Sequence, residues 1–217
     1  MQFVDAWTSL APLELLLLLA APGIAIAAML LPGRAVARTA SIGMAFAGSA
    51  LPDQGPLELR AGWFVLWIAV SIVSGFKHDI TPRAGLARPG GVESGAIALL
   101  LGAGLLVLLI VALGRQNLSP ELTRPSAVAL VLIIAGVAHL MLRRDALRGA
   151  MAFATIGLGL QWLDRAARIS VLEAPAFPEG AVLAATAIAV ALAARVALIR
   201  QHDAGSAWVS HAHDLHD

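Results

Sequence analysis

The stretch RRDALRGAMAFATIGLGLQWLDR, residues 143–165, begins with a strongly basic shoulder and then runs apolar for the length of a membrane span. Thr155 and Gln161 are the only polar groups inside the apolar part, and it contains no acidic residue. Lys and Arg gather at the cytoplasmic ends of transmembrane helices. The stretch therefore predicts a transmembrane helix anchored by a cytoplasmic basic turn, made of Arg143, Arg144 and Arg148.

The composition extends this prediction to the whole chain. Of its 217 residues, 59% are hydrophobic and 13% are charged, which is too apolar for the surface of a soluble domain. The net charge of +1 gives no basis for binding nucleic acid, and the absence of cysteine excludes disulfides, thiolate metal sites and a cysteine nucleophile. No nucleotide-binding or nucleophile motif occurs. We expect an all-α integral membrane protein without catalytic residues, cofactor or soluble small-molecule substrate.

Apolar runs recur along the chain and predict a polytopic bundle of about seven transmembrane helices. Besides the opening stretch, these runs cover residues 12–31, 35–51, 60–76, 94–114, 126–144 and 179–200. The second run is short and rich in small residues, so the count falls to six if it is re-entrant. Turn chemistry predicts loops over 77–95 and 115–126, and the alternating residues 57–60 predict a short extracytoplasmic strand or hairpin.

The Lys and Arg residues between the spans predict the orientation of the bundle. The first, third and fifth loops carry a positive excess, whereas the second, fourth and sixth contain acidic residues that offset their arginines. Because short cytoplasmic loops carry the positive excess, the N-terminus is predicted outside and the C-terminus inside.

Residues 126–200 resemble a known family of membrane subunits. The turn at 143–147 is similar to an Arg-Arg-Asn-Leu-like turn, and 175–188 to the start of the third helix, in subunit K of respiratory complex I and in the C-type subunits of multisubunit sodium/proton antiporters of the Mrp type. With its extra N-terminal spans, the chain most resembles component E of membrane-bound formate-hydrogenlyase-type hydrogenases. The resemblance implies a multi-pass protein of the bacterial inner membrane, in contact with antiporter-like and other membrane-arm subunits and with the lipid bilayer.

This resemblance divides the chain into four parts. Residues 1–94 hold the N-terminal transmembrane helices, and 95–125 the fourth helix and a loop. Residues 126–200 form the three-helix subunit-K-like module, and 201–217 a cytoplasmic His-rich tail.

The chain departs from the family at two positions that matter for proton transfer. Subunit K has a glutamate in its second helix and another in its third, and intramembrane acids are costly groups normally kept for function. Counted from the Arg-Arg turn, these positions fall at Ala154 and at Thr186 or Ala187, none of which is acidic. A role in packing therefore gains weight over proton transfer along the family's route.

Three other ionisable residues remain candidates for a proton path. The His139 side chain is of a type that can accept and release a proton near neutral pH, but an interfacial or helix-bonded histidine is the simpler interpretation. Glu14 lies near the outer end of the first span, where snorkelling to water is the simpler interpretation. Arg195 either snorkels towards the cytoplasm or pairs with an acid on a neighbouring subunit.

The tail supplies the only weak metal candidates, His211, His213 and His216. Imidazoles at these spacings can bind a metal, but His-rich polar tails are often adventitious. The alternative is a tail that lies on a partner, with Trp208 as its anchor.

These observations favour a non-catalytic membrane subunit of a proton-translocating complex with antiporter-like subunits, related to hydrogenases or complex I. Two alternatives stay open at this point. One is a membrane subunit of an inorganic-carbon-uptake complex with an antiporter-like partner. The other is a small independent transporter or scaffold, which the scarcity of mid-membrane charges disfavours.

The orientation can be tested on this cysteine-free background by introducing Ser119→Cys and Ser206→Cys one at a time. An impermeant maleimide added to intact cells should label Ser119→Cys and leave Ser206→Cys unlabelled until the membrane is opened. The reverse pattern would contradict the N-out, C-in orientation.

Overall fold

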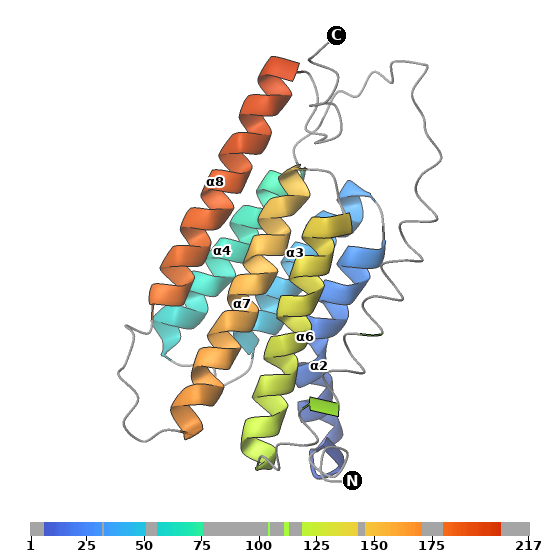
Figure 1. The fold of residues 1–217 in the computed structure, drawn as a ribbon, viewed down its shortest axis with the longest axis vertical. Coiled ribbons are helices and arrows are strands. Elements are labelled where there is room, and N and C mark those ends of the chain that lie inside the picture. Colours follow the sequence, from blue (N-terminus) through green and yellow to red (C-terminus); the bar gives the residue numbers. More distant parts are fainter. Residues whose placement is uncertain are drawn as a thin grey trace.

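The computed structural model describes residues 7–31, 33–50, 56–75, 104, 111–112, 119–142, 146–170 and 180–204. Six helices in these residues form one elongated bundle (Figure 1). They are α2 (Pro12–Leu30), α3 (Arg34–Ala50), α4 (Leu57–Gly75), α6 (Pro120–Leu142), α7 (Ala146–Ser170) and α8 (Ala181–Ala204). The all-α prediction is confirmed for this part of the chain.

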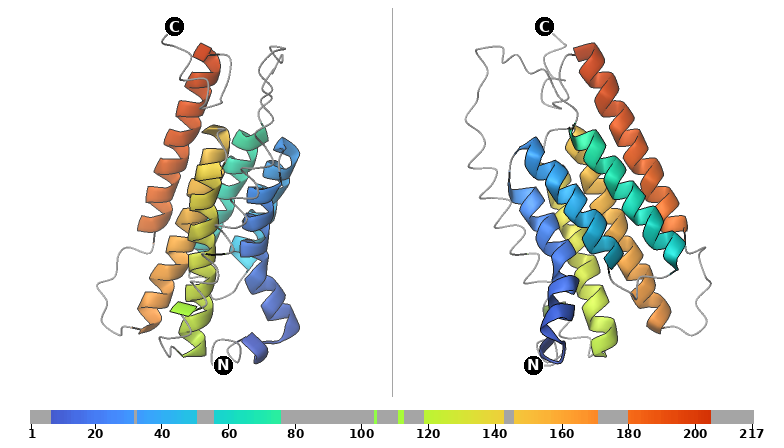
Figure 2. Two further views of the ribbon diagram at one scale, coloured as in Figure 1. Left: turned by 45° about the vertical axis from the view of Figure 1, so that its right-hand side comes forward. Right: turned by 180° about the vertical axis from the view of Figure 1, so that it is seen from behind.

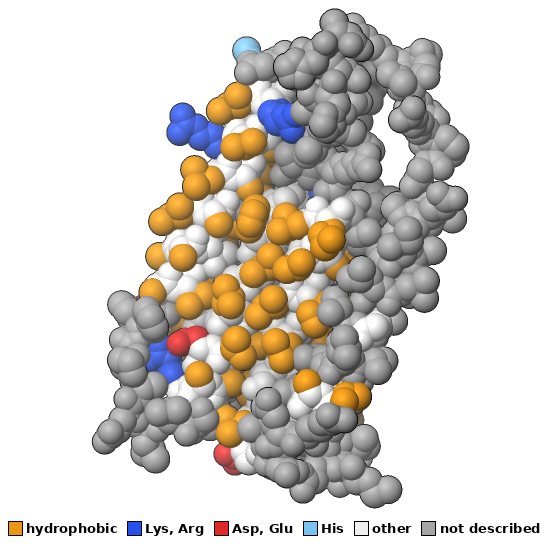
Figure 3. Space-filling view, viewed as in Figure 1, with side chains coloured by type: hydrophobic (Ala, Val, Ile, Leu, Met, Phe, Trp, Pro, Cys, Tyr) orange, Lys and Arg blue, Asp and Glu red, His pale blue; other side chains and the backbone are white. Residues whose placement is uncertain are grey.

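Four of these helices, α2, α4, α6 and α8, are long and apolar enough to cross a membrane. On the face drawn in Figure 3, apolar side chains cover the middle of the bundle and charged side chains lie towards its ends. This distribution is what a hydrocarbon layer between two polar interfaces requires. The described helices therefore indicate a membrane protein.

The helix directions bear on the number of spans. Helices α2, α4, α6 and α8 run the same way along the bundle, whereas α3 and α7 run the opposite way (Figures 1 and 2). Helix α4 thus ends at the same end of the bundle as α2 and α8, whereas α6 begins at the opposite end. A further span between α4 and α6 would bring the chain back to that opposite end. The predicted span 94–114 lies outside the described residues except at three positions, so the count of seven stays a prediction.

A predicted strand and part of a predicted loop are helical in the structure. Residues 57–60 form the first turn of α4 and not a strand, because the alternation of Leu with Glu and Arg also fits a helix end. The predicted loop at 115–126 contains the first turns of α6, which starts at Pro120. Proline is accepted at the first helical positions because their N–H groups have no partner within the helix.

Helix α7 is the opening stretch of the sequence, and it lies at the centre of the bundle. It packs against α6, α8, α4 and α3, and its residues Ala150, Met151 and Ala154 have no exposed surface. Although it is 25 residues long, it is less apolar than the four helices above. Because most of its sides pack on other helices, its interior positions favour small residues over large apolar ones.

Glycines bring the backbones of α6 and α7 into close contact. A Cβ atom at Gly159 would lie 2.8 Å from the carbonyl oxygen of Ala129, and one at Gly136 would lie 2.9 Å from the carbonyl oxygen of Ala152. Both distances are too short for real atoms. Glycine at these two positions is therefore a requirement of the packing, as in other helix pairs that meet through small residues.

We expect Gly159→Ala to destabilise the protein, because its methyl group would push against the backbone of α6. Overpacking of this kind costs about 1–3 kcal/mol. Gly149→Ala is the matched control on the same helix, since its Cβ would meet only Leu140, at 3.9 Å. Thermal unfolding in mild detergent should show a lower midpoint for Gly159→Ala alone; equal midpoints would contradict the packing argument.

Candidate functional site

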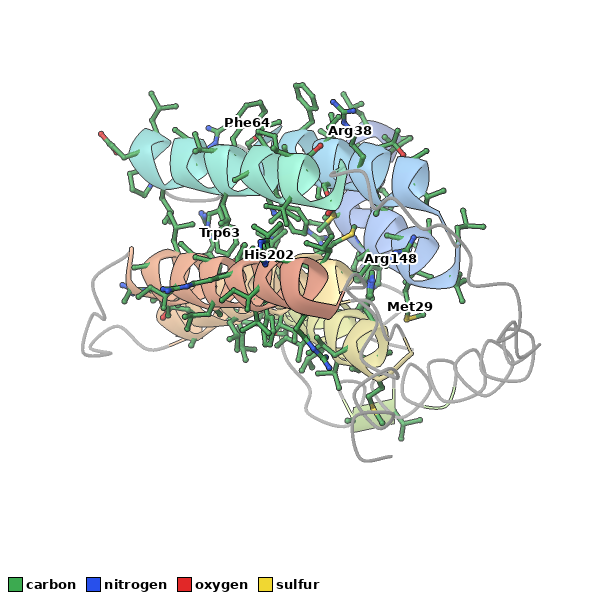
Figure 4. The ribbon with its side chains drawn as sticks, turned by 90° about the horizontal axis from the view of Figure 1, so that it is seen from above. Met29, Arg38, Trp63, Phe64, Arg148 and His202 are labelled. Atoms are coloured by element: carbon green, nitrogen blue, oxygen red, sulfur yellow. The ribbon has the colours of Figure 1, made fainter. Side chains whose placement is uncertain are left out.

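Arg148 lies in the first turn of α7, and its side chain reaches the end of α2 (Figure 4). Its Nη1 donates to the carbonyl of Leu31 at 3.4 Å, and its Nη2 donates to the carbonyl of Gly33 at 2.5 Å. Leu31 is the C-cap of α2, and Gly33 has a φ of 111°, which favours glycine. The last carbonyls of a helix have no partner in their own helix, and a cation there also interacts well with the helix dipole.

Arg148 makes a contact that the predicted basic turn did not include, and only 7% of the residue is exposed. The cytoplasmic location of this turn stays a prediction. The Arg148 guanidinium is occupied by backbone carbonyls and joins α7 to α2. The sequence gives no sign of this contact, because the partner carbonyls lie more than a hundred residues earlier in the chain. Arg143 and Arg144 lie outside the described residues.

A similar contact joins α3 and α4. Arg60, in the first turn of α4, donates from both Nε and Nη2 to the carbonyl of Ser49 near the end of α3, at 3.0 and 2.6 Å. At the other end of the pair, Arg38 of α3 lies beside Gly75, the last residue of α4, where a Cβ would be 3.4 Å from Arg38 Cδ. Each helix of this antiparallel pair thus places an arginine beside the C-terminal end of the other.

The positions that the sequence comparison aligned with the glutamates of subunit K lie inside the bundle. Ala154 of α7 has no exposed surface, and Thr186 of α8 is buried with its Oγ1 donating to the carbonyl of Val182 at 2.7 Å. Thr186 packs directly on Gly157, one turn after Ala154, and a Cβ on this glycine would overlap the threonine. Ala187 is partly buried. Thr186 and Gly157 thus form a close contact between α8 and α7.

His139 lies in the last turn of α6, with 2% of its surface exposed. Its side chain therefore lies inside the bundle. Its burial at the end of a helix agrees with a histidine held by its surroundings and leaves its titration untested.

The other two proton-path candidates are on the surface. Glu14 is exposed in the first turn of α2, where its negative charge interacts favourably with the positive end of the helix dipole. Arg195 is exposed on α8 among apolar side chains. The structure therefore does not bring His139, Glu14 and Arg195 together into one site.

The weak metal candidates His211, His213 and His216 lie outside the described residues. Within the ranges that the structure describes, no group of three or more His, Asp or Glu side chains is placed to hold a metal ion.

Two tryptophans of α4, Trp63 and Trp67, were not among the residues that the sequence pointed to. Both are buried, and Trp63 lies between α4 and α8, on the side of α4 opposite Phe64 (Figure 4). Their four-residue spacing, continued by Ser71, is the signal that was available in the sequence.

The chain matches no protein-family model, no curated protein and no solved structure.

The contact of Arg148 with the end of α2 predicts the effect of Arg148→Gln. A shorter neutral side chain removes the charged donor from these part-buried carbonyls, and losing a hydrogen bond to a charged group costs about 1–3 kcal/mol. Arg168→Gln is the control, because its 2.8 Å pair with Asp164 is partly exposed and spans only one turn of α7. Unfolding in detergent should therefore show a clear loss of stability for Arg148→Gln and little change for Arg168→Gln. Equal stabilities would contradict the role of Arg148.

Proposed function

We propose that the protein is a non-catalytic membrane subunit of a proton-translocating complex with antiporter-like subunits, related to the membrane arm of hydrogenases or complex I. The resemblance of residues 126–200 supports the kind of complex. One structural observation supports the packing role. Among the described residues, the buried charged or titratable side chains are an arginine and a histidine, and no carboxylate is buried.

The described acidic residues lie near helix ends. Glu14, Glu58 and Glu121 are exposed in the first turns of α2, α4 and α6. Asp164 is near the end of α7 and pairs with Arg168. A carboxylate relay across the membrane needs acids at mid-depth, and the described interior provides none. The proposal therefore places the proton path in the partner subunits.

Helix α8 provides the surface that a neighbouring subunit would contact. It packs on α7 and to a lesser extent on α4, and much of its length stays exposed. Its exposed large apolar residues are Ile188, Leu192, Val196, Leu198 and Ile199. Arg195 is exposed on the same helix, so a neighbour that contributes a carboxylate there would cover both the apolar surface and the charge.

The proposal includes the finer features predicted from the sequence. They are seven transmembrane helices, an N-out and C-in orientation, and a place in the bacterial inner membrane.

Purification in a mild detergent, followed by mass spectrometry, tests the assignment to a complex. We expect antiporter-like membrane proteins to co-purify in fixed proportion. A stable, monodisperse species that contains this chain alone would contradict a subunit role.

Two variants test whether the proton path lies in this subunit or in its partners. His139→Ala should leave assembly intact and reduce proton uptake by the reconstituted complex only modestly, because the path lies in the partners. Arg195→Ala should weaken assembly or a partner's proton transfer, because it removes the charge that lies among the exposed apolar residues of α8. Near-complete loss of uptake in His139→Ala, with normal assembly, would show instead that this histidine relays protons.

A further inference from the structure

The inward face of α4 carries a row of hydrogen-bonding side chains. Trp63, Trp67, Ser71 and Ser74 follow one another at spacings of four, four and three residues, which places them on one side of a helix. All four residues are more than nine-tenths buried, and Trp67 has no exposed surface.

Most of the polar atoms in this row have no protein partner. No hydrogen bond to any described residue is made by Trp63 Nε1, Trp67 Nε1 or Ser74 Oγ. Ser71 Oγ donates to the carbonyl of Arg38, but at a long 3.4 Å. Buried polar groups in folded proteins are nearly always hydrogen-bonded to protein or to ordered water, because an unsatisfied donor loses its hydration without compensation. A ligand with hydrogen-bond acceptors is therefore expected along this face.

The indole nitrogen of Trp67 faces a residue without a side chain. A Cβ at Gly48 of α3 would lie 4.0 Å from Trp67 Nε1 and 3.5 Å from Leu158 Cδ2. Both are ordinary van der Waals distances, so the glycine leaves unfilled a volume beside the indole nitrogen that a methyl group would fill. Buried water is found where polar groups of this kind have no protein partner.

We propose that the inward face of α4 binds buried water, with one site between Trp67 Nε1 and the backbone at Gly48. At this site the indole N–H donates to the water oxygen. The water in turn donates to a backbone carbonyl, since each carbonyl has a second lone pair that helix bonding leaves free. Trp63 and Ser74 bind further waters towards the two ends of α4.

The donors of this row all lie on α4, in the N-terminal half of the chain, and Leu158 of α7 borders the site at Trp67. The proposal involves neither His139 nor the positions Ala154 and Thr186, and it holds whether or not the protein is a subunit of a complex. Water in this row gives the described interior a hydrated region along α4.

Radiolytic hydroxyl-radical labelling tests the proposal in native membranes, with the full chain and whatever partners it has. Radicals formed from bound water oxidise the side chains beside it, and mass spectrometry of the peptides locates the oxidation. Brief mixing with H₂¹⁸O identifies the oxygen that comes from slowly exchanging water. We expect Trp63 and Trp67 to be labelled although they are buried. Met151 of α7 is equally buried and reactive, but its side chain has no hydrogen-bond donor and its thioether sulfur is only a weak acceptor, so it should stay unlabelled.

The variant Gly48→Ala isolates the site at Trp67. Its methyl group fits without displacing a neighbour and occupies the space of the water, so labelling of Trp67 should fall to the level of Met151 while Trp63 stays labelled. Gly149→Ala, which also fits its surroundings, should change neither tryptophan.

Two results would overturn the proposal. In the wild type, labelling of Trp67 no faster than that of Met151 would show a dry face, and this comparison decides alone if Gly48→Ala does not reach the membrane. Unchanged labelling of Trp67 in a folded Gly48→Ala would show that no water occupies this space. An acceptor from a neighbouring subunit would give the first result, because a dry hydrogen bond produces no radicals.

Discussion

The backbones of α6 and α7 meet at Gly136 and Gly159, and the arrangement of the other helices depends on this contact. Between transmembrane helices there is little hydrophobic driving force, because lipid is as apolar as the side chains it would replace. Close backbone approach, and the dispersion contacts that it allows, therefore supply much of the association. With α6 on one side, α7 presents its remaining sides to α8, α4 and α3, so the central helix reaches both halves of the bundle.

The arginines at helix ends provide hydrogen-bond donors for the backbone carbonyls of other helices. A carbonyl at the end of a helix must find a donor within the protein wherever water is excluded. Arg148 supplies donors to the end of α2, and Arg60 supplies them to the end of α3. Since each arginine belongs to a different helix from the one it contacts, the same hydrogen bonds that satisfy the backbone also fix which helices are neighbours.

The interior that results is polar in an unusual way for a protein proposed to sit beside proton channels. Its described part has small hydroxyl side chains that bond their own helices, as Thr155 and Thr186 do, and the indole groups of α4. Thr186 of α8 packs on Gly157. A described interior without a buried carboxylate suits the proposed subunit that packs against its neighbours, and the water proposed along α4 would satisfy its remaining donors.

The sequence by itself determined the helical class and the approximate helices, because each apolar run of membrane length must satisfy its backbone internally, and a helix does this locally. It also located Ala154 and Thr186 as interior positions without acids. The predictions of a strand at 57–60 and of a loop at 120–126 were wrong, because helix ends and loops contain the same residue types. Only the tertiary structure decided that Arg148 is an internal contact, that Gly48 leaves space beside Trp67, and that His139, Glu14 and Arg195 lie apart. These features depend on contacts between helices that are distant in sequence. The spacing of residues along one helix does not show which other helices pack against it.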